Sequence, residues 1–121
     1  MAYSQSDISA LIPLPPATFH ILMAVASEDR HGYAIIQDVA ELTSGAVKLS
    51  AGTLYRSIQR MLEQDLLIET ESATPESDDE RRRYYRITPF GRKVAAAEAR
   101  RLSQMVKLAQ RSGFAAKGLM R

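Results

Sequence analysis

The sequence predicts a mainly helical fold with one small β-hairpin, in which three short helices precede the hairpin and one long helix follows it. Apolar residues recur at the 3.6-residue spacing of an amphipathic helix in four segments. A single stretch rich in β-branched and aromatic residues interrupts them. With 121 residues and 45% apolar side chains, the chain has the size and composition of one ordinary globular domain.

The first two helices are bounded by proline and glycine. Residues 1–15 show no clean period and contain Pro13, so they are expected to form an N-terminal extension. Proline is tolerated in the first turn of a helix, so the pair Pro15–Pro16 can open the first one. Its apolar stripe is Ile21, Leu22 and Val25. A second helix is expected to begin after Gly32 and to cover residues 33–43, and Ser44–Gly45 ends that helix.

The third helix begins at Ser50, a good N-cap residue. One face carries an apolar stripe of Leu54, Ile58, Met61 and Leu62, and this face is expected to be buried. The opposite face is polar and is available to solvent or to a partner. Its members are Thr53, Arg56, Ser57, Gln59, Arg60 and Glu63.

Two short segments with strand-forming residues, 66–68 and 83–87, predict a hairpin around a charged loop. In the second strand Tyr85 and Ile87 share one face with Arg83, while Tyr84 and Arg86 point to the other. The loop contains Pro75 and an acidic run, residues 76–80. Acids beside DNA would repel phosphate, so this run is expected at the loop tip, turned outward or disordered.

The last helix begins at Thr88 as N-cap with Pro89 at the first helical position. It can continue to Ser112, which is about 24 residues, or roughly 36 Å. A heptad-like seam runs along it: Ala95, Ala99, Leu102, Val106 and Ala109. A helix this long has more apolar surface than a small domain can cover, which favours a homodimer. The alternative is a helix folded back on its own core.

The chain therefore divides into an extension (1–15), a winged helix-turn-helix domain (16–88), a dimerisation helix (89–112) and a flexible tail (113–121). In this layout a recognition helix enters the major groove of double-stranded DNA and the hairpin, or wing, touches the flanking backbone. The charge distribution agrees, since residues 1–47 carry a net charge of −4 and residues 48–121 a net charge of +6. A solvated charged surface with no such partner is the alternative.

Other classes of function have little support in the sequence. The chain has no cysteine, which excludes disulfides, Cys-ligated zinc and thiol chemistry. His20 and His31 have no spaced partners that would form a metal site, and there is no phosphate-binding loop or nucleophile motif. No apolar run reaches the roughly 18 to 20 residues of a membrane span. We therefore expect a cytoplasmic protein that is not an enzyme and uses no cofactor.

Three segments carry a resemblance to a known family. They are His31-Gly32-Tyr33, then Ser50-Ala51-Gly52-Thr53-Leu54-Tyr55, then Arg82-Arg83-Tyr84-Tyr85-Arg86-Ile87-Thr88-Pro89-Phe90-Gly91. In this order they resemble the PadR family of transcriptional regulators, over roughly residues 17–105. The resemblance implies a homodimeric repressor relieved by a small, lipophilic or aromatic molecule, here unidentified. The single C-terminal helix resembles the short-tailed subfamily.

The resemblance and the charge pattern together give the expected DNA-binding residues, on a pseudo-palindromic operator. They are Tyr33, Lys48, Ser50, Gly52, Thr53, Tyr55, Arg56, Gln59, Arg60, Arg81, Arg82 and Arg83. Tyr85 and Gly91 match family positions with a structural role. The three arginines of 81–83 are expected at the base of the wing.

One residue departs from the family pattern, and one other function stays open. The family has glycine before the wing's first hydrophobic pair, whereas this chain has Asp65, which tolerates left-handed backbone. The other function is a winged-helix module that binds a protein partner, suggested by the acidic loop and the acidic first 47 residues. The four tyrosines 33, 55, 84 and 85 also suggest a stacking platform for single-stranded nucleic acid, but they are spread over three elements.

Overall fold

The computed structural model describes residues 3–71 and 83–114. The order of elements is α1 (Gln5–Ser9), α2 (Pro16–Ala24), β1 (Arg30–His31), α3 (Gly32–Leu42), α4 (Ala51–Glu63), β2 (Leu67–Thr70), β3 (Tyr84–Ile87) and α5 (Pro89–Arg111). This confirms the predicted mainly helical, winged helix-turn-helix fold with a long C-terminal helix. Arg81, Arg82, the acidic run 76–80 and most of the expected tail lie outside the described residues.

The predicted helix starts at Ser50 and Thr88 are confirmed by their caps. The second helix, predicted over 33–43, begins and ends one residue earlier, at Gly32 and Leu42. The Ser50 hydroxyl accepts a hydrogen bond from the Thr53 amide (3.1 Å), and the Thr88 hydroxyl accepts one from the Gly91 amide (2.8 Å). His31 caps α3, since its Nδ1 accepts the Ala34 amide at 3.2 Å. Each cap satisfies a backbone donor that the first turn of a helix leaves unpaired.

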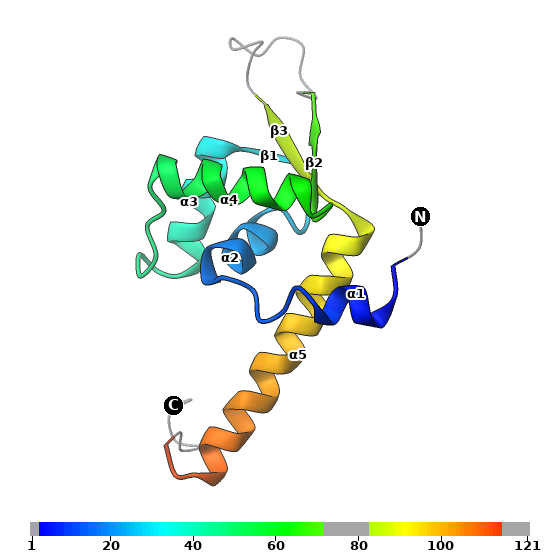
Figure 1. Cartoon of the computed structure of the whole chain (residues 1–121). Coiled ribbons are helices and arrows are strands. Elements are labelled where there is room, and N and C mark those ends of the chain that lie inside the picture. The colour runs from blue at the N-terminus through cyan, green and yellow to red at the C-terminus, as the bar shows by residue number, and fades with distance from the viewer. Residues whose placement is uncertain (1–2, 72–82, 115–121) are drawn as a thin grey trace.

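The core lies where α2, α3, α4, the sheet and the first half of α5 meet (Figure 1). The stripe predicted for the third helix is buried, with Leu54, Ile58 and Met61 at 0 to 2% exposure. The other large side chains that are fully buried are Ile21, Leu22, Val25, Ile35, Val39, Leu66, Leu67 and Val94.

The sheet has three strands in the order β1-β3-β2, all antiparallel, so the predicted two-stranded hairpin was incomplete. β1 has two residues, Arg30 and His31, which pair with Tyr85 and Tyr84. Neither residue has strand character in the sequence. β1 exists because β3, more than fifty residues later, offers a free edge with unpaired backbone groups.

The N-terminal extension is also more ordered than expected. It contains α1, which has a capping box between Ser4 and Asp7 and packs on α5. The Tyr3 ring stacks on Phe90 with 3.8 Å between ring centroids, and the Tyr3 hydroxyl donates to Asp65 at 2.5 Å. Five residues are too few to show a helical period, so no pattern in the sequence indicated α1.

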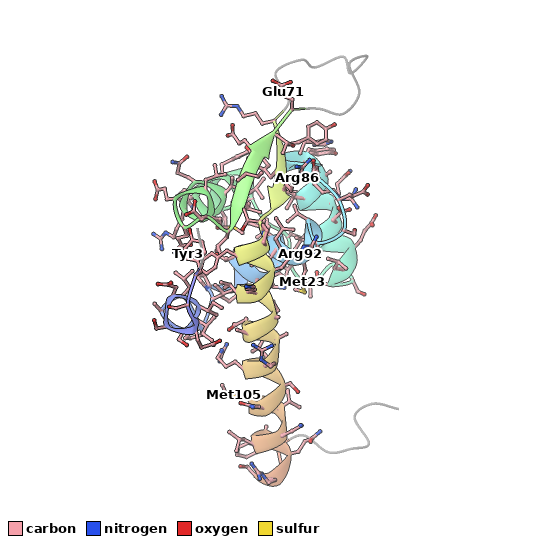
Figure 2. All side chains as sticks on the ribbon, turned by 90° about the vertical axis from the view of Figure 1, so that its right-hand side faces the viewer. Tyr3, Met23, Glu71, Arg86, Arg92 and Met105 are labelled. Atoms are coloured by element: carbon pink, nitrogen blue, oxygen red, sulfur yellow. The ribbon has the colours of Figure 1, made fainter. Side chains whose placement is uncertain are left out.

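Helix α5 leaves the body at the end opposite the wing (Figure 1). The side chains that pack on the rest of the chain lie in its first half: Phe90, Gly91, Val94, Ala97 and Glu98 are buried. Met105 lies on the projecting part (Figure 2). On the second half of α5 the apolar side chains of Leu102, Met105, Val106 and Leu108 are exposed.

Candidate nucleic-acid interface

Helix α4 presents its polar face to solvent, as the sequence predicted. Gly52, Tyr55, Arg56, Gln59 and Arg60 are exposed along it. Within residues 3–71 and 83–114, neither Lys48 nor Arg56 nor Arg60 forms an ion pair. These cations are therefore available to phosphates or base edges.

Three of the predicted side chains at α4, those of Ser50, Thr53 and Gln59, already have hydrogen-bond partners. The Ser50 hydroxyl accepts the Thr53 amide and lies 3.1 Å from the Thr53 hydroxyl, so its first role is to cap the helix. Gln59 donates to Glu63 at 3.3 Å, an exposed contact that water or a base can replace. The Arg56 guanidinium lies over Gly52, where an added Cβ would be 3.2 Å from its Nη1.

The Tyr55 ring of α4 lies against Gly32, which is the first residue of α3 and the sequence neighbour of Tyr33. Gly32 is buried, and a Cβ added there would collide with the Tyr55 hydroxyl. The glycine thus makes room for the Tyr55 ring directly beside the start of α3, where Tyr33 stands. Both rings remain open, with exposures of 64% for Tyr33 and 50% for Tyr55. The sequence placed both tyrosines at the interface but did not reveal the contact with Gly32.

In the wing, which consists of β2, β3 and the segment between them, Arg83 lies at the end of β3 that is away from the body. Leu67 and Ile87 pair at the end next to the body, while Arg83 precedes β3 at the other end (Figure 1). The predicted position at the base of the wing was therefore wrong for Arg83. Its side chain is 71% exposed and is 3.4 Å from Glu69, a contact that contributes little in water.

A cluster at the wing was missed by the sequence reasoning. The Asp29 carboxylate accepts two hydrogen bonds from Arg86, each 3.0 Å, and one from Thr70 at 3.3 Å. The hydrogen bond from Arg86 holds the pKa of Asp29 below its ordinary value despite partial burial. No sequence signal could have found this cluster, because β1 had to be known first.

The predicted seam of α5 separates into a covered and an uncovered part. Ala95 is partly buried against the chain's own core, so the folded-back alternative describes the first half of the helix. Ala99 is exposed, Leu102 is 36% exposed and Val106 is 51% exposed. Ala109 is half-buried, and Met105 and Leu108 flank the seam with exposures of 51% and 53%.

One carboxylate is buried at the middle of α5. Glu98 is 2% exposed and accepts two hydrogen bonds of 2.8 Å from Arg101. The Arg101 hydrogen bond, assisted by the Leu14 backbone, holds the pKa of Glu98 below its ordinary value of 4.5. Through its contact with the Leu14 backbone, Glu98 also connects the loop before α2 to α5.

Glu98→Gln is expected to lower the free energy of unfolding at pH 7 by about 1 to 3 kcal/mol, because it removes a charge-assisted, buried contact. Since the folded-state pKa is depressed, this stabilisation is complete above about pH 4.5 and is lost as the pH falls through the lower folded value. Urea titrations at pH 7 and pH 3 measure the difference. The exposed control Glu41→Gln should change little at either pH, and a Glu98→Gln effect equally large at pH 3 would contradict the account.

Two pockets lie outside the α4 surface. One, of about 350 Å³, lies between α1 and α5 and is lined by Tyr3, Gln5, Ile8, Lys93, Ala96 and Arg100. The other, of about 300 Å³, is lined by Met23, Ala24, Ser27, Arg30, Asp38, Glu41 and Leu42. Among the residues the structure describes, no group of three or more His, Asp or Glu could hold a metal ion. No helix in the described parts of the chain is long and apolar enough to cross a membrane.

The comparisons with known proteins agree with this geometry. The model of the transcriptional regulator PadR-like family matches residues 21–97, which run from α2 into α5. The chain belongs to this family. As a PadR-like protein it is a DNA-binding transcription regulator with no enzymatic activity expected of its family.

Relatives of this PadR-like chain include proteins of similar length. A protein of Lysinibacillus sphaericus is 36% identical over 87 residues, which is 72% of each chain. The transcriptional regulator Rv3488 of Mycobacterium tuberculosis is 32% identical over 88 residues, 73% of this chain and 77% of that one.

Solved structures share the fold at lower identity. A PadR family transcription regulator from Clostridium difficile has a TM-score of 0.70 at 24% identity, with 80% of this chain and 97% of that chain covered. A transcriptional regulator from Clostridium thermocellum has a TM-score of 0.68 at 22% identity, with 91% and 97% covered. The winged-helix architecture with a long C-terminal helix is thus common to them.

Proposed function

We propose that this PadR-like regulator is a homodimeric repressor that binds a pseudo-palindromic operator. In this proposal α4 enters the major groove and the wing contacts the flanking backbone. The observation that carries it is the uncovered polar face of α4, where Arg56 and Arg60, with Lys48 just before the helix, have no ion-pair partners in the described parts of the chain. A protein-binding surface would not need three unpaired cations on and beside a helix that fits the major groove.

The second half of α5 supports the dimer. Five of its apolar residues, Ala99, Leu102, Met105, Val106 and Leu108, are solvent-exposed in the single chain, and burial against a second copy removes that apolar surface from water. Two copies joined through α5 place two α4 helices on one face, as a two-fold symmetric operator requires. In this scheme residues 16–88 bind DNA and 89–112 dimerise.

Relief by a small molecule is the third part of the proposal. The pocket between α1 and α5 is the site we assign to it, because its walls belong to both the N-terminal segment and the dimer helix. A ligand there can change how α5 leaves the body and hence the spacing of the two α4 helices. Its apolar residues, Ile8 and Ala96, and its aromatic residue, Tyr3, fit a ligand with an apolar or aromatic body.

Arg56→Ala is expected to weaken binding to the operator by about 1 to 3 kcal/mol while changing binding to scrambled DNA much less, because a base contact is lost. The operator is first recovered by genome-wide DNA pull-down with the purified protein. Fluorescence anisotropy on operator and scrambled duplexes across a range of salt then measures both affinities.

Arg83→Ala is the matched control for that experiment. As a phosphate contact, Arg83 should support both duplexes alike, and its loss should reduce the salt slope by about one. Equal losses on both duplexes for Arg56→Ala would show that Arg56 reads no base. Wild-type protein that binds both duplexes equally would contradict the repressor proposal as a whole.

A further inference from the structure

Strands β2 and β3 of the wing project beyond the helices (Figure 1), and β3 is joined to the body by its pairing with β1, at Arg30–Tyr85 and His31–Tyr84. A two-stranded hairpin is marginally stable by itself, so its contacts with the body must determine its direction. On its inner face Leu67, Tyr85 and Ile87 are buried. Apolar contacts of this kind stabilise the attachment, but they are non-directional and leave the angle of the wing loosely defined.

Besides the backbone pairing of β1 with β3, directional side-chain contacts reach the outer face of the wing from Asp29, which binds Arg86 there; Arg86 is labelled in Figure 2. The two Arg86 nitrogens, Nε and Nη2, bind different oxygens of the carboxylate at 3.0 Å each. The Thr70 hydroxyl donates to the same carboxylate at 3.3 Å. Arg86 belongs to β3 and Thr70 to β2, so one carboxylate fixes both strands. A bidentate arginine–carboxylate pair is also restricted in its geometry.

Asp29 is also close in sequence to α3, which contacts α4. It directly precedes β1, and β1 leads without a break into α3. The first residue of α3 is Gly32, against which the Tyr55 ring of α4 packs. A path of three residues therefore joins the wing's outer face to the place where α3 and α4 meet.

The Asp29–Arg86 pair is suited to orientation more than to stability or charge. The Arg86 side chain is 56% exposed, and exposed pairs contribute little to the free energy of unfolding. Asp29 also neutralises Arg86, so this arginine adds no net charge to the DNA-facing surface. Among the described residues, Arg83 in contrast has only the weak 3.4 Å contact with Glu69.

We propose that Asp29 is a positioning residue of the DNA interface. By binding Arg86 and Thr70 together, it sets the angle of the wing relative to α4, so that both elements contact the same duplex at once. The inference rests on the proposed function, since it assumes that α4 and the wing bind DNA.

Two variants separate geometry from charge. Asp29→Asn removes the carboxylate and uncovers the Arg86 charge, whereas Arg86→Lys keeps the positive charge but loses the planar fork. Anisotropy titrations give the affinity for operator DNA divided by the affinity for scrambled DNA. Both variants should lower this ratio by about threefold to thirtyfold. Only Asp29→Asn should also steepen the salt slope, by about one.

Glu69→Gln is the matched control. Like Asp29→Asn, it removes one negative charge near an arginine of the wing. The partner of Glu69, however, is Arg83, which belongs to the wing itself, so the contact does not join the wing to the body. It should raise the affinity for both duplexes alike and leave their ratio unchanged. Thermal unfolding of each variant fixes an assay temperature at which the protein is folded, and Arg86→Lys carries the test if Asp29→Asn does not fold.

The outcomes are distinct. An operator preference that is unchanged in Asp29→Asn and Arg86→Lys, in a wild type that discriminates, overturns the positioning role alone. A preference that falls equally in Glu69→Gln shows an effect of charge and also overturns it. A wild type without any preference overturns the proposed function and this inference with it.

Discussion

Replacing Leu102 and Val106 together by glutamate is expected to convert the protein to a monomer. Both side chains are exposed on the part of α5 that projects from the body. In the proposed dimer they face a second copy, where an unpaired carboxylate is costly to bury. The helix itself should persist, because glutamate is a good helix former and neither residue belongs to the chain's own core.

The consequence for DNA binding is large. Two linked recognition helices gain about 10²-fold to 10⁴-fold in affinity over one, and the monomer loses this gain. Size-exclusion chromatography with light scattering should give 13.4 kDa for the variant and twice that mass for the wild type. Lys107→Glu places the same residue on α5 away from the seam and should remain dimeric. A double variant that keeps the wild-type mass would contradict the assignment of the dimer to α5.

Gly91→Ala is expected to destabilise the fold by about 1 to 3 kcal/mol, because the methyl group has no room. Its Cβ would collide with the backbone carbonyl of Leu66 and would lie 3.0 Å from the Ile87 side chain. A backbone carbonyl cannot turn away as a side chain can. The same Leu66 carbonyl accepts the Thr88 amide at 3.1 Å, so the shift would also disturb the cap of α5.

Thermal unfolding measures this effect, with a decrease in Tm of roughly 5 to 15 °C. Gly52→Ala is the control, since its Cβ would meet only the movable end of Arg56, at 3.2 Å. Alanine also favours a helix over glycine, so the Tm of Gly52→Ala should stay the same or rise slightly. A Gly91→Ala protein as stable as the wild type would show that α5 and the turn at Leu66 are less tightly packed than the structure has them.

The parts of the fold that the sequence predicted depend on neighbours a few residues apart. Helical periodicity gave α2 to α5, and the caps at Ser50 and Thr88 fixed where two of them begin. The substitution at Asp65 was also interpreted correctly, since this residue has φ +63 and the turn survives. These features are local, so propensity and spacing are enough to find them.

The missed parts depend on residues far apart in the chain. β1 is defined by its pairing with β3, the Tyr55 ring is placed by Gly32, and Asp29 meets Arg86 across 57 positions. None of these contacts has a periodic signature. The twelve expected DNA-binding residues were chosen from the family resemblance and the charge pattern. The role of each one stays a prediction.

The most direct test of the central claim is a footprint of the wild-type protein on the DNA that it recovers from its own genome. A dimer that inserts two α4 helices should protect two similar half-sites related by a two-fold axis, with centres roughly 10 base pairs or a multiple apart. Protection of a single half-site, or protection that does not depend on sequence, would contradict the account of a dimeric, operator-specific regulator.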